Sequence, residues 1–415
     1  MKLWCDKGKF IEIPAVSELP NNTYELDLSL NELTSVNFSE PMESLSSLDL
    51  TGNEIQEIKS KAFDNVPTLE FLDLTDNQIE EIEVDAFAKL KNLKYLNLTN
   101  NKLGSLQKDT FNSLIWLREL RLAKNPLTHI HPDLLLPLKN LMLLDLTEIS
   151  AYTLKDDQFH FTPNLETLFL SSNKFRVVPV NGLRSAAKLK SLYLDENPFA
   201  ELIGESFVGL STLNELSVSK CSRLTDIKRE TFSDLYNLKR LTIKSNPALT
   251  YIDQHAFRRM FNSSWLKLEE VDLSNNRLMS LAADALPWCE LKKLDLTENH
   301  WTCDCKFKWI KSCQNENVVV RGVRCAQPEQ HRTYEVSLID VDRFSCPRVS
   351  EVKEMRVFRM MIFIIGSAML LVLSVMLALL IKREGIVRWW RERRRGNGAI
   401  YYVKARSTPA DCNDM

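Results

Sequence analysis

The 415-residue sequence carries almost no net charge, with 53 Lys and Arg against 55 Asp and Glu. A balance of −2 gives no reason to expect a nucleic-acid partner. Charged residues make up 26% of the chain and hydrophobic residues 44%, which excludes a disordered or a uniformly membrane-embedded protein. The chain therefore has the composition of a globular protein, either two or three ordinary domains or one elongated array.

The sequence also lacks the motifs of common enzymes. It contains no nucleophile elbow, no phosphate-binding loop and no metal-protease helix. His129 and His131 flank Ile130 in "THIHP", so they are the outward neighbours of a core residue and not a metal pair. We expect no enzyme activity, no catalytic residue, no metal and no cofactor.

One long segment lacks charge altogether. Residues 360–381 form a run of 22 uncharged residues, which at about 1.5 Å per residue can cross roughly 30 Å of hydrocarbon. A buried core helix is the alternative, but such helices rarely lack a polar face. The following "KREGIVRWWRERRR" has seven basic residues in fourteen. This excess predicts a single-pass type I plasma-membrane protein with its N-terminus outside and its C-terminus in the cytoplasm.

What fills most of the chain is a repeat, L-x-x-L-x-L-x-x-N-x-L. The copies begin at Leu45, Leu69, Leu93, Leu117, Leu165, Leu189, Leu213, Leu238, Leu268 and Leu291, after a partial copy around Asn31. Leucines at alternate positions of a short strand point into a core, while the residues between them face solvent. This pattern is that of a leucine-rich repeat solenoid of about twelve coils, an α/β fold with a parallel sheet on its concave face.

The asparagine of each repeat is expected to satisfy backbone groups where the chain turns away from the strand. Stacked coils would then form an asparagine ladder. Ile149 and Cys221 interrupt this ladder. Cysteine is an accepted substitute, so we expect Cys221 to be buried and unreactive, whereas the turn at Ile149 must be satisfied in another way.

The longest step, from Asn246 to Asn276, contains "RRMFNSSW", which we expect to bulge on the convex or flanking side. It includes one of four N-glycosylation acceptor triplets, and chance occurrence of such triplets is the alternative to their use. The acceptors are Asn21, Asn37, Asn97 and Asn262.

A cysteine cluster follows the last coil, at Cys303, Cys305, Cys325 and Cys346. The final coil of a solenoid exposes a hydrophobic end that a capping module must cover. Metal or disulfides could explain the spacing, and outside the cell disulfides are favoured.

This segment resembles the C-terminal cysteine-rich cap of extracellular leucine-rich repeat proteins, with Trp301 and Trp309 also in place. The resemblance implies that Cys303 pairs with Cys325 and Cys305 with Cys346. Cys289 and Cys313 are extra to the pattern, and a third bond between them is one option. Similar single-pass proteins include insect cell-surface adhesion and guidance proteins of the capricious and tartan kind, and Toll-like receptors. The short tail favours the former.

The exposed strand positions contain a column of aspartates, which is common in this repeat and indicates a site only weakly. Larger side chains stand out among them, and aromatic residues and arginine dominate interface energetics. We predict a protein-binding concave face, against the alternative of ordinary surface scatter. Its residues are Phe71, Tyr95, Arg121, Leu143, Phe169 and Tyr193. A glycan on Asn97 would shield part of it.

The tail after the apolar segment is basic and aromatic. Its tryptophans and arginines are predicted to lie on anionic lipid of the inner leaflet, although charge that only sets membrane orientation is the alternative. They are Trp389, Trp390, Arg391, Arg393, Arg394 and Arg395.

The start, "MKLWCDKGKF", has no apolar stretch of the kind a signal peptide needs. Cys5, Ile13-Pro14 and Leu19-Pro20 resemble the latter half of an N-terminal leucine-rich repeat cap. We therefore expect a signal peptide and half a cap to lie upstream of Met1.

These observations predict six segments: a partial N-terminal cap (1–20), the repeats (21–300), the C-terminal cap (299–346), a stalk (347–359), the membrane helix (360–381) and a cytoplasmic tail (382–415). The expected function is a cell-surface receptor or adhesion protein that binds an extracellular protein or cell-surface partner. A tail without a catalytic domain would act through a co-receptor or cytoplasmic adaptor. The alternative is a non-signalling scaffold or regulatory subunit that holds an enzyme or matrix protein at the surface.

Overall fold

A computed structural model describes residues 1–20, 22–258, 266–313, 318–319, 322–344 and 360–376, with the single residues 382 and 388. The chain forms two compact units, Met1–Ser345 and Cys346–Met415. The first unit holds the repeats and three of the four clustered cysteines, Cys303, Cys305 and Cys325.

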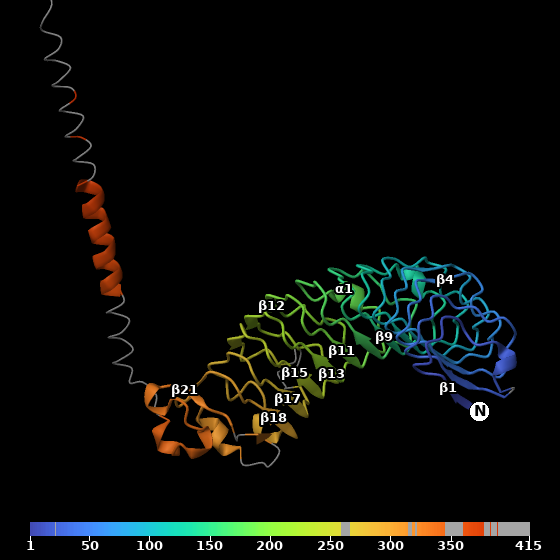
Figure 1. Ribbon diagram of the computed structural model, residues 1–415. Helices are drawn as coiled ribbons and strands as arrows, with labels where there is room; N and C mark the ends of the chain where they lie inside the picture. The colour runs from blue at the N-terminus through green and yellow to red at the C-terminus, as the bar shows by residue number, and fades with distance from the viewer. Residues whose placement is uncertain are drawn as a thin grey trace, which may run out of the picture. The chain divides into compact units, whose positions relative to one another are not determined.

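The first unit is built on a sheet of fourteen parallel strands that follow one another in chain order (Figure 1). The middle residue of most strands is a buried leucine, and its two neighbours are partly exposed, as the alternation in the repeat predicts. The strands are β1 (Lys2–Trp4), β2 (Glu25–Asp27), β3 (Ser47–Asp49), β5 (Phe71–Asp73), β7 (Tyr95–Asn97), β8 (Glu119–Arg121), β9 (Leu143–Asp145), β10 (Thr167–Phe169), β11 (Ser191–Tyr193), β13 (Glu215–Ser217), β15 (Arg240–Thr242), β17 (Glu270–Asp272), β18 (Lys293–Asp295) and β20 (Val318–Val319).

The remaining elements of this unit are short. Three smaller sheets contain β4 (Glu57–Ile58) and β6 (Glu81–Ile82); β12 (Glu201–Leu202), β14 (Asp226–Ile227) and β16 (Tyr251–Ile252); and β19 (Trp301–Thr302) and β21 (Cys325–Gln327). One α-helical turn, α1, spans Val180–Leu183, and the 3-10 turns are Val16–Glu18, Pro132–Leu135, Trp288–Glu290, Lys308–Ser312, Glu329–His331, Val336–Leu338 and Val341–Arg343.

The asparagine ladder is present and each rung is shared between coils. The Asn77 amide nitrogen donates to the Leu50 carbonyl at 2.9 Å and to the Leu74 carbonyl at 3.2 Å, and its oxygen accepts from the Ile55 amide at 3.1 Å. Leu50 also accepts a bond from Asn53, at 2.9 Å. Each carbonyl in this part of the ladder therefore has two asparagine donors, one from its own coil and one from the next.

Where Ile149 interrupts the ladder, its side chain is buried and the chain compensates through the backbone. The Leu122 and Leu146 carbonyls each keep one bond, from a single asparagine, at 3.1 and 2.8 Å. The Ile149 carbonyl accepts from the Thr128 amide at 2.8 Å, and Thr128 has a φ of 59°. One non-polar rung is tolerated because the neighbouring rungs still serve the shared carbonyls.

At Cys221 the side chain is buried, and its sulfur lies 3.5 Å from the Ser219 carbonyl. Burial raises the pKa of the Cys221 thiol to about 12. A thiol of this kind stays protonated, so it acts as a ladder residue and not as a nucleophile.

A spine of aromatic rings fills the space behind the sheet. Phe63, Phe87 and Phe111 stack in sequence, with ring centroids 5.7 and 6.3 Å apart. A second stack, Phe207, Phe232 and Phe257, leads to Trp288. These buried rings thus form the second half of the core.

The cysteine cluster covers the last coils with disulfides. Cys303 is joined to Cys325, and Cys289 to Cys313. Cys305 is also disulfide-bonded. Its expected partner Cys346 lies outside the described residues.

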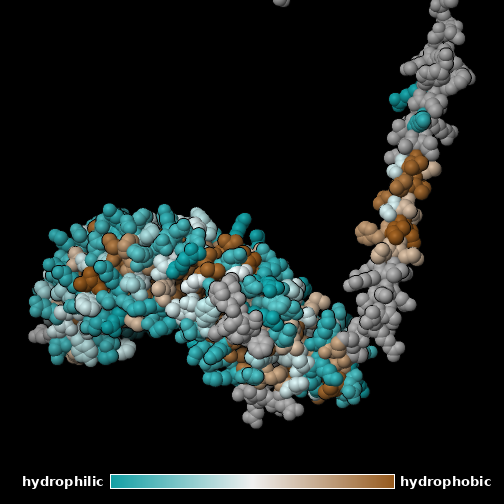
Figure 2. All heavy atoms as spheres, turned by 180° about the vertical axis from the view of Figure 1, so that it is seen from behind, coloured by the Kyte–Doolittle hydropathy of each residue, from teal (hydrophilic) through white to brown (hydrophobic). Residues whose placement is uncertain are grey.

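In the second unit, residues 360–376 are helical, and Figure 2 shows hydrophobic residues over much of this helix. Ser367 and Ser374 donate their hydroxyls to the carbonyls of Ile364 and Leu371, at 2.9 and 2.8 Å. Residues 377–381 of the predicted membrane span lie outside the described residues. Within the part of the chain that is described, no helix is both long and apolar enough to cross a membrane.

Candidate protein-binding site

The exposed side chains of the large sheet form two columns, because the strands pair in register. The first strand position places Phe71 beside Tyr95, and the third position places Phe169 beside Tyr193. All six predicted concave-face residues lie on this sheet and are partly exposed. They fall in two columns, with Phe71, Tyr95 and Leu143 at the first strand position and Arg121, Phe169 and Tyr193 at the third. Their use as one binding face stays a prediction.

Phe71 and Tyr95 stack with ring centroids 4.3 Å apart. The Tyr95 hydroxyl accepts a hydrogen bond from the Asn97 amide at 3.1 Å, which fixes the ring on the sheet. Partial burial, and secondarily the charge of Asp73, raises the pKa of the Tyr95 phenol, so it is neutral at physiological pH.

Phe169 and Tyr193 form the second pair, with centroids 4.5 Å apart. Partial burial again raises the pKa of Tyr193, with a further contribution from Glu215. Three strand steps separate β7 from β10, roughly 14 Å at the usual strand spacing. The two pairs can therefore contact one protein surface at the same time.

Arg121 and Leu143 lie on β8 and β9, between the aromatic pairs. The Arg121 guanidinium is 3.4 Å from the Glu119 carboxylate and 3.8 Å from that of Asp145. These partly exposed ion pairs hold the arginine on the sheet without burying its charge, so it remains available to a ligand.

The aspartate column has a local structural role. The Asp49, Asp73 and Asp145 carboxylates each accept a hydrogen bond from the backbone amide two residues later, at 2.9 to 3.0 Å. Asx turns of this kind close the strand end. The column is thus part of the repeat, as the sequence interpretation favoured.

Asn97, one of the predicted glycosylation acceptors, lies within the sheet, and its glycosylation stays a prediction. The side chain is only 9% exposed, and its amide nitrogen donates to Tyr95 and, at 3.2 Å, to Asp73. A glycan would have to be attached to that nitrogen, which already has two partners in the sheet. Asn37 is exposed.

The repeats match the family described as leucine rich repeat over residues 43–103, 91–148, 139–199 and 211–270, together more than half of the chain. The chain belongs to the leucine-rich repeat family.

Among curated proteins, the leucine-rich repeat transmembrane protein FLRT2 of Rattus norvegicus, and likewise those of Mus musculus and Homo sapiens, is 28% identical over 225 residues. The match covers 49% of this chain and 34% of the relative, so it spans about a third of the relative's length.

Two solved structures share the fold. A chain of an octameric complex of latrophilin 3, Unc5D and FLRT2 has a TM-score of 0.58 and 24% identity, covering 83% of this chain and 96% of that one. The crystal structure of a TLR13–ssRNA13 complex has a TM-score of 0.53 and 23% identity, covering 74% and 52%. At these identities the likeness shows the leucine-rich repeat fold alone.

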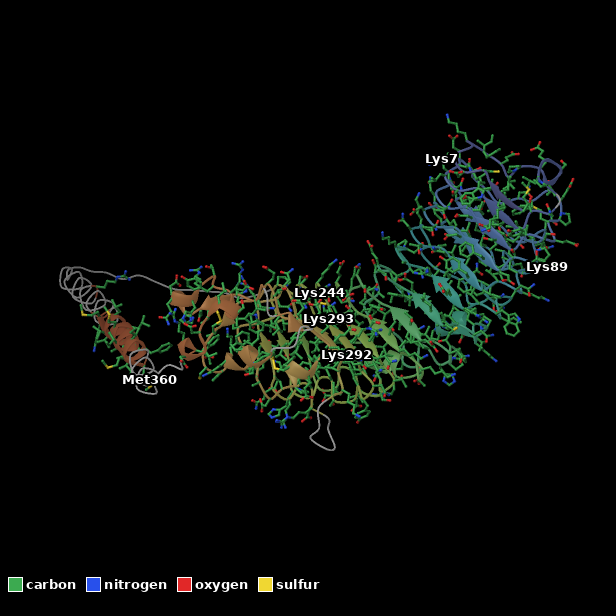
Figure 3. All side chains as sticks on the ribbon, turned by 90° about the horizontal axis from the view of Figure 1, so that it is seen from below. Lys7, Lys89, Lys244, Lys292, Lys293 and Met360 are labelled. Carbon is green, nitrogen blue, oxygen red and sulfur yellow. A yellow bond between two sulfur atoms is a disulfide. The ribbon has the colours of Figure 1, made fainter. Side chains whose placement is uncertain are left out.

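The C-terminal leucine-rich repeats carry charges that are paired between coils. Glu269 lies 3.1 Å from Lys239 and 2.7 Å from Lys292, and Lys244 lies 3.5 Å from Asp272 (Figure 3). Exposed pairs of this kind contribute little binding energy. This part of the sheet is therefore a weaker candidate for the protein-binding site than the two aromatic pairs.

Several predicted sites fall outside the described residues. They are the acceptors Asn21 and Asn262, and the tail residues Trp389, Trp390, Arg391, Arg393, Arg394 and Arg395. The described residues contain no group of three His, Cys, Asp or Glu placed to hold a metal ion.

Sequence reasoning missed one exposed residue, Trp116, which lies in the loop before β8 and is 52% exposed. It immediately precedes a motif leucine, where neighbouring leucine-rich repeats carry Asn92 and Asn140. An aromatic residue in place of an amide at that position is the signal that could have revealed it.

Proposed function

We propose that this chain is a cell-surface receptor or adhesion protein whose repeats bind an extracellular protein through the concave sheet. The observation that carries the proposal is the pair of stacked aromatic groups, Phe71 with Tyr95 and Phe169 with Tyr193, on either side of Arg121. Stacking fixes the rings in advance, so little side-chain entropy is lost on binding. Half-exposed aromatic residues and arginine are the residue types that dominate interface energies.

A membrane anchor at residues 360–381 is part of the proposal. The uncharged run, the helix over residues 360–376 and the basic segment that follows support it. The two serines of the helix bond their hydroxyls to backbone carbonyls, which lowers the cost of placing them in lipid. The FLRT2 relatives are named transmembrane proteins, in agreement with this.

A protein is the favoured ligand. The similar FLRT2 chain was solved in a complex with latrophilin 3 and Unc5D, both proteins. The proposed concave site is also mixed in polarity, with aromatic rings, an arginine and aspartates, which suits a protein surface better than a small molecule.

Cell mixing tests this function. Cells that display the full chain behind a cleavable signal sequence are mixed with differently coloured cells that lack it. Clumps of expressing cells alone indicate homophilic binding, and mixed clumps indicate a partner on the other cells. We expect Tyr193→Glu to abolish clumping, because it places a second negative charge beside Glu215 and removes the stacked pair.

Tyr152→Glu is the matched control, since Tyr152 is 62% exposed and lies outside the large sheet. Equal surface display of both variants is verified by antibody staining. Clumping that survives Tyr193→Glu contradicts the concave site, and no clumping in any mixture contradicts adhesion. If deletion of residues 396–415 leaves every cellular effect intact, signalling through the tail is wrong and the scaffold alternative stands.

A further inference from the structure

The residue just before the first motif leucine bonds one coil to the previous one in several coils. Its side chain donates to a backbone carbonyl of the preceding coil in five described coils, at 2.8 to 2.9 Å. The donors are Thr68, Asn140, Asn164, Thr212 and Asn237. This position therefore has a polar structural role.

Trp116 occupies the same position with a large, half-exposed ring. Ile115 beside it is 46% exposed, and Met142 in the next coil is 41% exposed. The three lie on two adjoining stretches of chain, because the Asn140 side-chain amide donates to the Ile115 carbonyl at 2.8 Å and the Met142 backbone amide donates to the Arg118 carbonyl at 2.8 Å. Ile115, Trp116 and Met142 are together called the flank patch, and their exposed side chains are not part of the hydrophobic core.

The rim of the flank patch is basic. Lys91, Arg118 and Lys139 are exposed, and none has an ion pair among the residues that the structure describes. Lys91 and Lys139 are the equivalents of Ile115 in the previous and the next coil. Arg118 is the equivalent of Met142 in the coil before it, and its carbonyl accepts from the Met142 amide.

Two acidic residues at the position of Arg118 and Met142 in other coils are paired with lysines. Glu70 lies 2.7 Å from Lys94, and Glu166 lies 2.7 Å from Lys190. The flank patch therefore combines exposed apolar area with a net positive edge.

We infer that the flank patch docks an extracellular protein whose contact surface is apolar at its centre and rimmed by Asp and Glu. A central tryptophan within a charged rim is typical of an interface hot spot, and a complementary acidic rim would speed association and fix orientation. A second copy of this chain fits poorly, because a two-fold contact would place one basic rim against the other. The flank patch lies outside the large sheet, so this inference stands apart from the concave site.

The test uses the full chain and two phage-displayed peptide libraries. Both libraries have central Leu, Phe or Trp positions; one flanks them with Asp and Glu, the other with Lys and Arg. We expect the acidic library to enrich at least tenfold more on the wild-type chain than on Trp116→Asn. Arg118→Glu should remove the preference for acidic flanks, because it keeps the apolar centre and reverses one rim charge.

Trp116→Asn is expected to fold, because the amide can bond to the Lys91 carbonyl as Asn140 does to that of Ile115. An unchanged thermal midpoint verifies this. Tyr152→Asn, a matched exposed aromatic, should retain the enrichment, and so should Tyr193→Glu, which separates this surface from the concave one. The inference is wrong if the basic library is the one enriched, or if the wild-type chain and Trp116→Asn enrich the acidic library equally. It is also wrong if light scattering shows self-association that depends on Trp116, or if the flank patch instead binds phosphatidylserine vesicles.

Discussion

The ladder makes a quantitative prediction at Asn77. Its replacement by alanine removes the acceptor of the Ile55 amide and the two N–H donors of the Asn77 side chain, which reach the Leu50, Leu74 and Thr75 carbonyls. The Leu50 and Leu74 carbonyls each retain a second asparagine donor, at 2.9 Å in both cases. The Ile55 backbone amide donates to the Asn77 side-chain oxygen, and no second acceptor in the ladder replaces it.

An orphaned buried amide costs about 1–3 kcal/mol, and each lost bond to a carbonyl that stays satisfied costs about 0.5–1.5 kcal/mol. Asn77→Ala should therefore lower the free energy of unfolding by about 2–6 kcal/mol. Glu80→Ala is the control, because that side chain is exposed and its contact with Lys102 is 4.0 Å long. Its effect should stay within about 0.5 kcal/mol.

Urea unfolding measures the loss, and hydrogen exchange locates it. We expect the Ile55 amide to exchange faster in Asn77→Ala, with little change at amides several coils away, because solenoid coils interact mainly with their neighbours. Equal midpoints for Asn77→Ala and Glu80→Ala would show that the asparagines do not stabilise the stack.

Three other predictions follow from single groups. Burial, and secondarily the neighbouring aspartates, raises the pKa of Asp49 in the folded chain, so ionisation of this carboxyl disfavours folding. Asp49→Asn should therefore stabilise the chain at pH 7. This gain in stability should shrink as the pH falls through the raised pKa toward 4. Urea midpoints across pH measure it, and a constant gain contradicts it. Cys221 should resist iodoacetamide at pH 8 and react only in denaturant, as peptide mass spectrometry can verify; native labelling would refute its burial. Replacing Cys303 and Cys325 with serine removes a disulfide that spans 22 residues, and the loss of its constraint on the unfolded chain should lower the free energy of unfolding by roughly 3 kcal/mol. The thermal midpoint should then be lower than that of the wild-type chain under oxidising but not under reducing conditions.

The repeat architecture could be predicted from the sequence because one period governs both the strand and the ladder. Leu72, Leu96 and Leu120 are buried in register, as their alternate spacing requires. The compensation at Ile149 could not be predicted, since it depends on the path of the backbone at Thr128, which no residue type specifies.

The candidate site was less predictable than the fold. The period of the repeat predicts that residues such as Phe71 and Phe169 are exposed on the sheet, but it does not give the distances between their side chains. Asn97 carries an acceptor triplet, yet its amide is engaged by Tyr95 across the same strand. Trp116 was missed because only strand positions were considered for exposure, and its exposure arises in a loop.

Ladder carbonyls such as that of Leu50 accept hydrogen bonds from two asparagines, and this limits which substitutions the repeats can accept. A single missing asparagine leaves both carbonyls beside it with one donor each, whereas two missing in succession would leave the carbonyl between them with none. The two irregular rungs, Ile149 and Cys221, are separated by Asn173 and Asn197. An isolated substitution therefore leaves every ladder carbonyl with a donor and removes the acceptor of a single amide, as at Asn77. Adjacent substitutions would also orphan a carbonyl, so the spacing between substitutions, as well as their number, limits how far the sequence can vary.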